Sequence, residues 1–206
     1  NADRQENEIK NQEERVIEKI RVETWRKMKD INSEYVGKIR FESGLISYDI
    51  VQAKDNEKYL NLSWDLKETS QGAIFMDYRN KKDDQNIILY GHYVYKDENA
   101  MFGPLHQLVD KENYEKNKYI EVEYEEGIKR YEIAYVYYYE MGNPLMEYFH
   151  TNYEKEYFDI YKSKIEEHSF YDTGVYINEK QKFLTLQTCV RNRDDLRLIV
   201  VAKEVN

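Results

Sequence analysis

The chain has 206 residues, a formal charge of −9, and 21 tyrosines that contribute to its 41% hydrophobic content. This length suits one domain, or one domain with an appendage. The negative charge argues against nucleic acid as a partner, because phosphate binding needs a basic surface. The sequence contains no run of ~18 apolar residues of the kind that spans a membrane.

The first thirty residues predict a helix. They are highly charged and contain no glycine or proline, and Ile9, Val16 and Ile20 recur at the spacings of one helix face. We expect residues 1–30 to form a helical segment packed on the domain formed by residues 31–206. A stalk that binds a partner or lies close to a membrane is the alternative. Because the chain starts at Asn1 rather than methionine, we also expect that an N-terminal anchor has been removed.

Short runs of alternating apolar residues begin at Tyr35 and predict β-strands. Tyrosine is β-prone and amphipathic, which suits a sheet whose outer face meets water. The polar stretch 55–65 is typical of a short helical turn or a loop. The predicted strands are "YVGKIRF" (35–41), "ISYDIV" (46–51), "GAIFMDY" (72–78), "NIILYGHYVY" (86–95), "KYIEVEY" (118–124), "IKRYEIAYVYYYE" (128–140), "FLTLQT" (183–188) and "RLIVVAK" (197–203).

Residues 144–168 have a different pattern, which predicts a helix inserted between two strands. The segment begins at Pro144, a residue suited to the first turn of a helix. Its apolar residues recur every four positions, at Leu145, Phe149, Tyr153, Tyr157, Tyr161 and Ile165. About eight strands, a helix at the front and this late insertion indicate a mainly β fold, either a barrel or a sandwich.

Cys189, at the end of "LTLQTC" (184–189), is the only cysteine of the chain. It forms no internal disulfide, so it is either a small buried apolar group or a nucleophile at the rim of a strand. One cysteine cannot build a zinc site alone, the four histidines lack paired spacing, and the acidic run 110–115 lacks the glycine of a calcium loop. Since no glycine-rich phosphate loop is present either, we expect no metal and no cofactor.

A thiol nucleophile needs a base or cation that holds the thiolate, and a donor for the oxyanion. His92 follows the apolar run "NIILYG", and Gly91 would let another segment approach closely beside the imidazole. From pattern alone, such a histidine is more often structural. We expect His106, in a turn-rich stretch, to be exposed. His150 and His168 lie on or near the predicted helix, without an obvious route to the cysteine.

Arg197 is the best candidate for the donor. It opens the last apolar run, where neighbouring residues would hold it, whereas Arg191 and Arg193 fall in a polar loop. Residues 190–196 are long enough to bring Arg197 beside Cys189 on an adjacent strand. The pattern therefore predicts that these two residues are cross-strand neighbours.

Several ordered segments resemble the class B sortases. They are "INSEYVGKIRF", "ISYDIVQAKDNEKYLNLSWD", "GAIFMDYRN", "NIILYGHYVYKDENAMFGPL", and "LTLQTC" followed by "RLIVVAK". The resemblance runs from about residue 31 to residue 203 and includes the helix before the cysteine strand. It implies an eight-stranded sortase-type β-barrel with N-terminal helices. It also implies a cysteine transpeptidase on the extracellular face of the membrane of a Gram-positive cell.

The resemblance assigns a role to each of Cys189, His92 and Arg197, the predicted catalytic trio. The Cys189 thiolate would attack the threonine carbonyl of a sorting signal, and a thioacyl intermediate would pass to an amine. His92 would protonate the leaving amine and later deprotonate the incoming one. Arg197 would donate hydrogen bonds to the carbonyl oxygen or the substrate backbone. Thr188 matches the threonine before the nucleophile, and we expect it to form a local hydrogen bond.

Other positions match residues that line the groove for the signal peptide, with a place in the core as the alternative. They are Asn56, Leu60, Tyr157 and Phe158. Two departures from the class B pattern bear on substrate preference. Gln187 stands where a serine is common, and "YVYKDENAMFG" follows the histidine where a shorter, Asn-led stretch is usual.

The implied partners are a surface protein with an NPQTN-like signal near its C terminus and an amine of the peptidoglycan precursor. We expect a monomer. The alternatives are a cysteine hydrolase on the same scaffold, a pilin-polymerising sortase, and a non-catalytic, tyrosine-rich surface-binding module in which Cys189 is inert.

Overall fold

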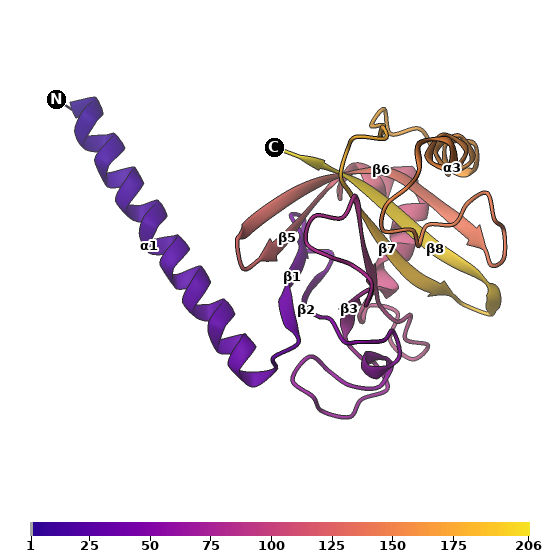
Figure 1. The fold of residues 1–206 in the computed structure, drawn as a ribbon, viewed down its shortest axis with the longest axis horizontal. Helices are drawn as coiled ribbons and strands as arrows, with labels where there is room; N and C mark the ends of the chain where they lie inside the picture. Colours follow the sequence, from indigo (N-terminus) through magenta and orange to yellow (C-terminus); the bar gives the residue numbers. More distant parts are fainter. Residues whose placement is uncertain (1) are drawn as a thin grey trace.

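Eight strands close into a barrel in the computed structural model, which describes residues 2–206 (Figure 1). Neighbouring strands follow the order β1-β2-β3-β4-β7-β8-β6-β5. The predicted eight-stranded, mainly β barrel is thus confirmed, and each predicted run overlaps one strand. The strands are β1 (Tyr35–Phe41), β2 (Ser47–Val51), β3 (Ile74–Met76), β4 (Asn86–Tyr90), β5 (Tyr119–Tyr124), β6 (Gly127–Glu140), β7 (Phe183–Val190) and β8 (Arg193–Val205).

The pairing of β4 with β7 determines where functional residues can meet. These two strands run parallel, with Tyr90 opposite Gln187, whereas β7 and β8 form an antiparallel hairpin. Parallel neighbours need a long crossover, and here it contains β5, β6 and the helix before β7. As a result, the carboxyl ends of β4 and β7 lie together at one end of the barrel.

Strand β7 is buried on both faces. Its inward residues Leu184 and Leu186 are fully buried in the barrel core, where they join residues of β1, β2, β4 and β8. Its outward residue Phe183 packs in a second apolar cluster with residues of β6, β8 and the helix before β7. Gln187, on the same outward face, is only 9% exposed. The outer face of β7 is therefore covered rather than open to water.

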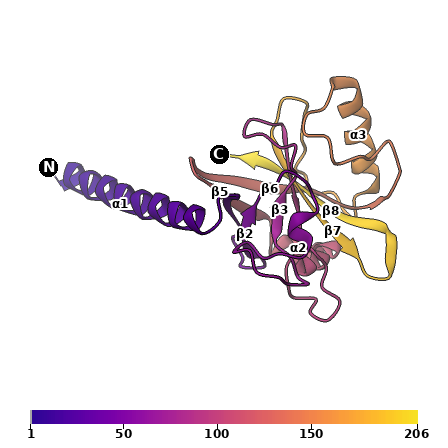
Figure 2. The same cartoon turned by 60° about the horizontal axis from the view of Figure 1, so that its bottom comes forward.

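Helix α1 (Ala2–Ile31) contacts the barrel only near its C-terminal end. Residues 2–20 are exposed, and the helix points away from the barrel in both views (Figures 1 and 2). Trp25 is buried against Tyr35, and Arg21 donates hydrogen bonds to the carbonyls of Tyr124 and Glu125. The predicted packing of residues 1–30 is thus limited to the last turns, because the narrow apolar stripe of residues 2–20 meets no other element. Asn1 lies outside the described residues, and within residues 2–206 no helix combines the length and apolar content needed to cross a bilayer.

The predicted helix 144–168 is shorter than expected. Helix α3 (Lys155–His168) lies outside the barrel, on the side away from α1 (Figure 2), but residues 144–154 are not helical. The carbonyls of this segment bind the β3–β4 region instead. Asn86 donates from its side chain to the carbonyls of Tyr148 and His150 and from its backbone to that of Thr151. The four-residue apolar spacing was therefore correct for α3 and wrong for the segment before it.

Short helices connect the strands. The stretch 55–65 contains the 3₁₀-helix η1 (Lys58–Leu60), as predicted. The crossover after β4 contains the 3₁₀-helix η2 (Gly103–Val109) and the short helix α2 (Lys111–Glu115). Strand β4 ends at Tyr90 rather than continuing to residue 95, and Tyr93 instead bridges to Met101.

Candidate active site

Cys189 and Arg197 are cross-strand neighbours in the β7–β8 hairpin. Directly opposite residues of antiparallel strands have Cβ atoms about 5 Å apart and share one face of the sheet. The prediction from the connecting length is thus confirmed, although the connection is tighter than expected because β8 already begins at Arg193. The pairing register shifts directly after Cys189, as it does at a β-bulge, and the thiol is free and half-buried. Bulges often re-aim side chains next to active sites.

The Arg197 guanidinium caps the turn of the same hairpin. Its Nη1 donates to the carbonyls of Asp194 at 3.0 Å and Leu196 at 2.8 Å. Among the described residues, Nε and Nη2 have no hydrogen-bond partner. These two donors remain available to an oxygen that approaches Cys189.

His92 lies beyond the carboxyl end of β4, level with Cys189. Tyr90 is opposite Gln187 in the parallel pair, where neighbouring strands are about 4.8 Å apart. His92 and Cys189 each follow these matched positions by two residues. His92 Nε2 is 2.7 Å from the Leu60 carbonyl oxygen. Because a carbonyl only accepts, Nε2 carries a proton and Nδ1 is the nitrogen left to exchange one.

The fold therefore brings the predicted trio to one barrel end, although no side-chain hydrogen bond joins its members anywhere in residues 2–206. Close cations stabilise a thiolate, and a guanidinium offers a planar fork of donors to an oxyanion. The arrangement can support nucleophilic attack by sulfur, proton exchange by His92 and charge stabilisation by Arg197.

Tyr148 is a site residue that the sequence did not reveal. It is 7% exposed and lies on the segment that was expected to be helical. Burial raises the pKa of its hydroxyl; the Arg197 guanidinium opposes this rise and Cys189 adds to it, so the hydroxyl lies within electrostatic range of both groups. The incorrect helix assignment hid this neighbour.

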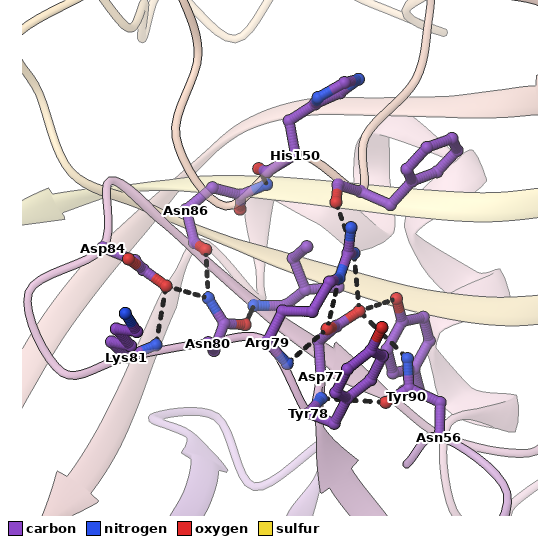
Figure 3. Close-up of polar contacts among 12 residues, drawn as sticks. Asn56, Asp77, Tyr78, Arg79, Asn80, Lys81, Asp84, Asn86, Tyr90 and His150 are labelled. Carbon is purple, nitrogen blue, oxygen red and sulfur yellow. Dashed lines mark hydrogen bonds and ion pairs between the residues drawn. The ribbon is translucent and has the colours of Figure 1, made fainter. Parts of the chain in front are cut away.

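Asn56 belongs to a buried network centred on Asp77 (Figure 3). Its side-chain amide donates to Asp77 Oδ2 at 3.1 Å, and its Oδ1 accepts from the Tyr78 N–H. Tyr90 donates to Asp77 Oδ2 at 2.7 Å, and Arg79 donates to the same carboxylate through its backbone and its guanidinium. Burial alone would raise the pKa of Asp77, but the hydrogen bonds from Arg79 and Tyr90 hold it below its usual value.

The same network ties down the segment before α3. Arg79 Nη2 donates to the Phe149 carbonyl at 2.6 Å. In a second branch, Asn80 donates to Asp84 and to the Asn86 carbonyl, and accepts from the Ile88 N–H. One buried carboxylate thus links the Asn56 loop, strand β4 and the loop that carries Tyr148. The closely spaced acid and base in "MDYRN" were the sequence signal for it.

The remaining predicted residues have mixed surroundings. The Leu60 side chain is half-buried, and its carbonyl accepts from His92. Tyr157 is half-buried and donates to the Pro144 carbonyl and to Glu147. Phe158 is 1% exposed and packs on Phe183 in the second apolar cluster. The structure therefore places Phe158 in the core, the alternative that the sequence left open.

Thr188 and His106 differ from expectation. Thr188 is completely buried, and its Oγ1 has no hydrogen-bond partner within residues 2–206, so the expected local hydrogen bond is not formed. Gln187 accepts from the Gly91 N–H through its carbonyl. His106 is half-buried rather than exposed, and its Nε2 is 2.9 Å from the Cys189 carbonyl oxygen.

A pocket of about 410 Å³ lies at the other end of the barrel, between α1 and the strands. It is lined by Trp25, Tyr35, Ile87 and Tyr124 among others, and by none of the predicted site residues. Ile87 is near the start of β4, whereas His92 follows its end.

In residues 2–206, no group of three His, Cys, Asp or Glu side chains is arranged to hold a metal ion.

Comparison with known proteins gives matches over most of the chain. A family model described as the Sortase domain matches residues 42–205. Sortase B of Staphylococcus aureus is 30% identical over 181 residues, which are 85% of this chain and 72% of that protein. Sortase B of Listeria monocytogenes is 32% identical over 172 residues, or 82% of this chain and 68% of that protein. The X-ray structure of Clostridium perfringens Sortase B superposes with a TM-score of 0.79 at 30% identity and covers 88% of this chain and 99% of that one.

Proposed function

The chain belongs to the class B sortases, and from this premise we propose that Cys189, His92 and Arg197 catalyse cell-wall sorting. Sortases are cysteine transpeptidases of the cell surface that act on proteins bearing a sorting signal and on amine nucleophiles. The observation that carries the proposal for this chain is the strand register. It brings its only cysteine beside Arg197 and level with His92 at one barrel end.

In the first half-reaction, the Cys189 thiolate attacks the threonine carbonyl carbon of an NPQTN-like signal. The developing oxyanion accepts hydrogen bonds from the free Nε and Nη2 of Arg197. The tetrahedral intermediate collapses as the C–N bond breaks, and His92 gives its Nδ1 proton to the leaving amine. The products are a thioester on Cys189 and the released C-terminal peptide.

In the second half-reaction, an amine of the peptidoglycan precursor attacks the thioester carbon. His92 takes the proton that the amine loses, and Arg197 again holds the oxyanion. When the C–S bond breaks, the thiolate of Cys189 is restored and a new amide joins the surface protein to the acceptor. The proton count therefore balances over the two steps, and His92 ends as it began.

The substrate groove lies between two walls in this proposal. Asn56 and Leu60 belong to one, Tyr157 belongs to the other, and Gln187 also contacts the signal peptide. The enzyme works as a monomer on the extracellular face of the membrane of a Gram-positive cell. Its 1–30 segment is an appendage to a catalytic domain formed by residues 31–206.

A peptide assay tests the function. The chain is incubated with an NPQTN-containing peptide, with and without an added primary amine, and the products are separated by mass. A transpeptidase gives the amide only when the amine is present. Cleavage to the free acid regardless of amine would assign the hydrolase, and transfer to a lysine of a pilin fragment alone would assign the pilin-polymerising enzyme. No cleavage, together with slow, pH-independent alkylation of Cys189, would favour the non-catalytic module.

A further inference from the structure

The stretch that follows His92 makes direct contacts with the hairpin that carries the nucleophile. On the β4 side of β7, the Gln187 carbonyl accepts from the Gly91 N–H at 3.1 Å. Carbonyls two residues apart on a strand point to the same side, so the next one on this side is that of Cys189. Strand β4 has already ended there, and His106 supplies the donor, with Nε2 at 2.9 Å from the Cys189 oxygen.

His106 is carried by a rigid element. It lies on η2, in which Leu105 and Leu108 are fully buried, and the preceding Phe102 is fully buried as well. The Phe102 N–H donates to the His92 carbonyl at 3.1 Å. One short element therefore bonds to the backbone of His92 at its beginning and to the backbone of Cys189 one turn later.

Gly91 makes this attachment possible. A Cβ at position 91 would lie 2.5 Å from Cγ of Phe102 and 2.6 Å from Cδ1 of Ile74. A glycine lets the Phe102 ring approach the β4 backbone closely. This is the close approach expected from the sequence, and the approaching residue is the one that holds the His92 carbonyl.

Tyr95 adds a second attachment to the hairpin, at its turn. Asn192, which has a positive φ of 58°, donates from its N–H to the Tyr95 hydroxyl at 2.9 Å, and its Oδ1 accepts from that hydroxyl at 3.0 Å. The Arg191 guanidinium lies 5.7 Å from the Tyr95 ring centre. The turn between β7 and β8 is thus held from outside the hairpin.

We propose that residues 93–106 hold the hairpin of Cys189 at a fixed position relative to His92, with His106 and Tyr95 as its positioning residues. The proposal rests on the proposed function, since it concerns the distance between two reacting groups. Catalytic groups work best when their geometry is held before reaction, and a displacement of about 1 Å can cost about 100-fold in rate. Residues 93–103 of this stretch are also one of the two places where the sequence departs from the class B pattern.

The role of His106 is positional rather than electrostatic. Burial lowers the pKa of His106, although the hydrogen bond to Cys189 opposes this shift. The imidazole is therefore neutral at neutral pH and adds no positive charge beside the thiolate. Its ring also packs edge-on against Tyr93, with ring centres 5.0 Å apart.

Two variants of His106 separate the hydrogen bond from the packing. His106→Phe keeps a ring against Tyr93 and removes the donor, whereas His106→Gln keeps an N–H at about the same reach. We expect kcat of peptide transfer to fall about tenfold in His106→Phe with KM within about twofold, and to stay within about threefold of wild type in His106→Gln. His168→Phe is the matched control, because His168 also bonds a backbone carbonyl, that of Lys164, but lies exposed on α3. Tyr95→Phe should show a smaller loss, about threefold.

Three results would overturn the proposal: unchanged kcat in His106→Phe, equal losses in the Phe and Gln variants, or a loss confined to KM. A His106→Gln variant as inactive as Cys189→Ala would make His106 catalytic instead. The rate of Cys189 alkylation by iodoacetamide is measured in parallel and does not need the sorting reaction. If alkylation distinguishes the Phe and Gln variants but wild type transfers no peptide, the proposed function fails and the positioning role stands. If wild type transfers peptide and neither readout distinguishes the variants, only the positioning role fails.

Discussion

Cys189 and Arg197 are held differently from His92 and the groove residues. The first two lie on paired strands, where backbone hydrogen bonds on the ladder set their spacing. His92 lies in a loop, where it depends on the Leu60 carbonyl and the Phe102 N–H, and Asn56 depends on Asp77. A ladder survives most side-chain changes, whereas a loop held by single side chains does not. Mutations on the strands should therefore affect chemistry alone, and mutations in the network around the loops should affect stability as well.

The largest effect is expected for Cys189→Ala. The ladder of β7 does not need the thiol, so the fold should be kept while the nucleophile is lost. We expect no amide product above background in the peptide assay and a free energy of unfolding within about 1 kcal/mol of wild type. Full transfer by this variant would show that the mechanism does not use the thiol. Loss of the fold would contradict the expectation that mutations on the strands affect chemistry alone.

Arg197→Lys should come next, with kcat lower by about 100-fold. Lysine keeps the charge but lacks the planar fork, so it cannot serve the Asp194 and Leu196 carbonyls and an oxyanion together. Steady-state kinetics on the peptide substrate measure the loss, and urea unfolding should show little change in stability. Near-normal turnover would move the role to Arg191 or Arg193.

Asp77→Asn tests whether the loops depend on single side chains for their position. Asp77 is fully buried and accepts hydrogen bonds from Arg79, Tyr90 and Asn56. Removing its charge leaves the Arg79 guanidinium without its charged partner, and we expect the free energy of unfolding in urea to fall by about 2–4 kcal/mol, with a parallel loss of transfer. Asp83→Asn is the control, since the Asp83 side chain is 90% exposed. Equal, small changes in both variants would show that the network does not hold the loops.

The unfolding free energies of wild type and Asp77→Asn should converge at low pH. The folded-state pKa of Asp77 is lowered, so its contribution to stability is complete above the unfolded-state value of about 3.9 and is lost as pH falls through the lower, folded-state value. The difference in unfolding free energy between wild type and Asp77→Asn should be constant from pH 5 to pH 7, as rough bounds, and narrow below about pH 4. A difference that grows on acidification would give the opposite sign and contradict the network.

The smallest effect is expected for deletion of residues 2–20. These residues are exposed, and the contacts of α1 with the barrel begin at Arg21. We expect turnover to be unchanged and the unfolding free energy to shift by less than about 0.5 kcal/mol. Trp25→Ala is the counterpart, because Trp25 is 8% exposed and its loss should cost about 3 kcal/mol. A large loss on deletion would mean that residues 2–20 pack on the barrel as the sequence predicted.

The sequence by itself determined the features that depend on local periodicity. Alternation along each run is enough to predict a strand, and eight runs predicted the eight strands. The length of the link 190–196 was enough to predict that Arg197 and Cys189 are neighbours, because consecutive antiparallel strands can be joined by a short connection. Resemblance to a family then supplied the roles of these residues.

Only the tertiary structure decided the contacts between distant segments. Asn86 bonds the Tyr148 carbonyl across 62 positions, and His106 reaches the Cys189 carbonyl across 83. The first contact draws residues 144–154 out of the helix that their spacing favours, and the second replaces β4 where that strand ends. Tertiary hydrogen bonds of this kind can override local propensity, because a buried carbonyl must find a donor wherever the fold supplies one. For the same reason, the places of Tyr148 and His106 at the site and the partners of Asp77 could be assigned only from the closed barrel.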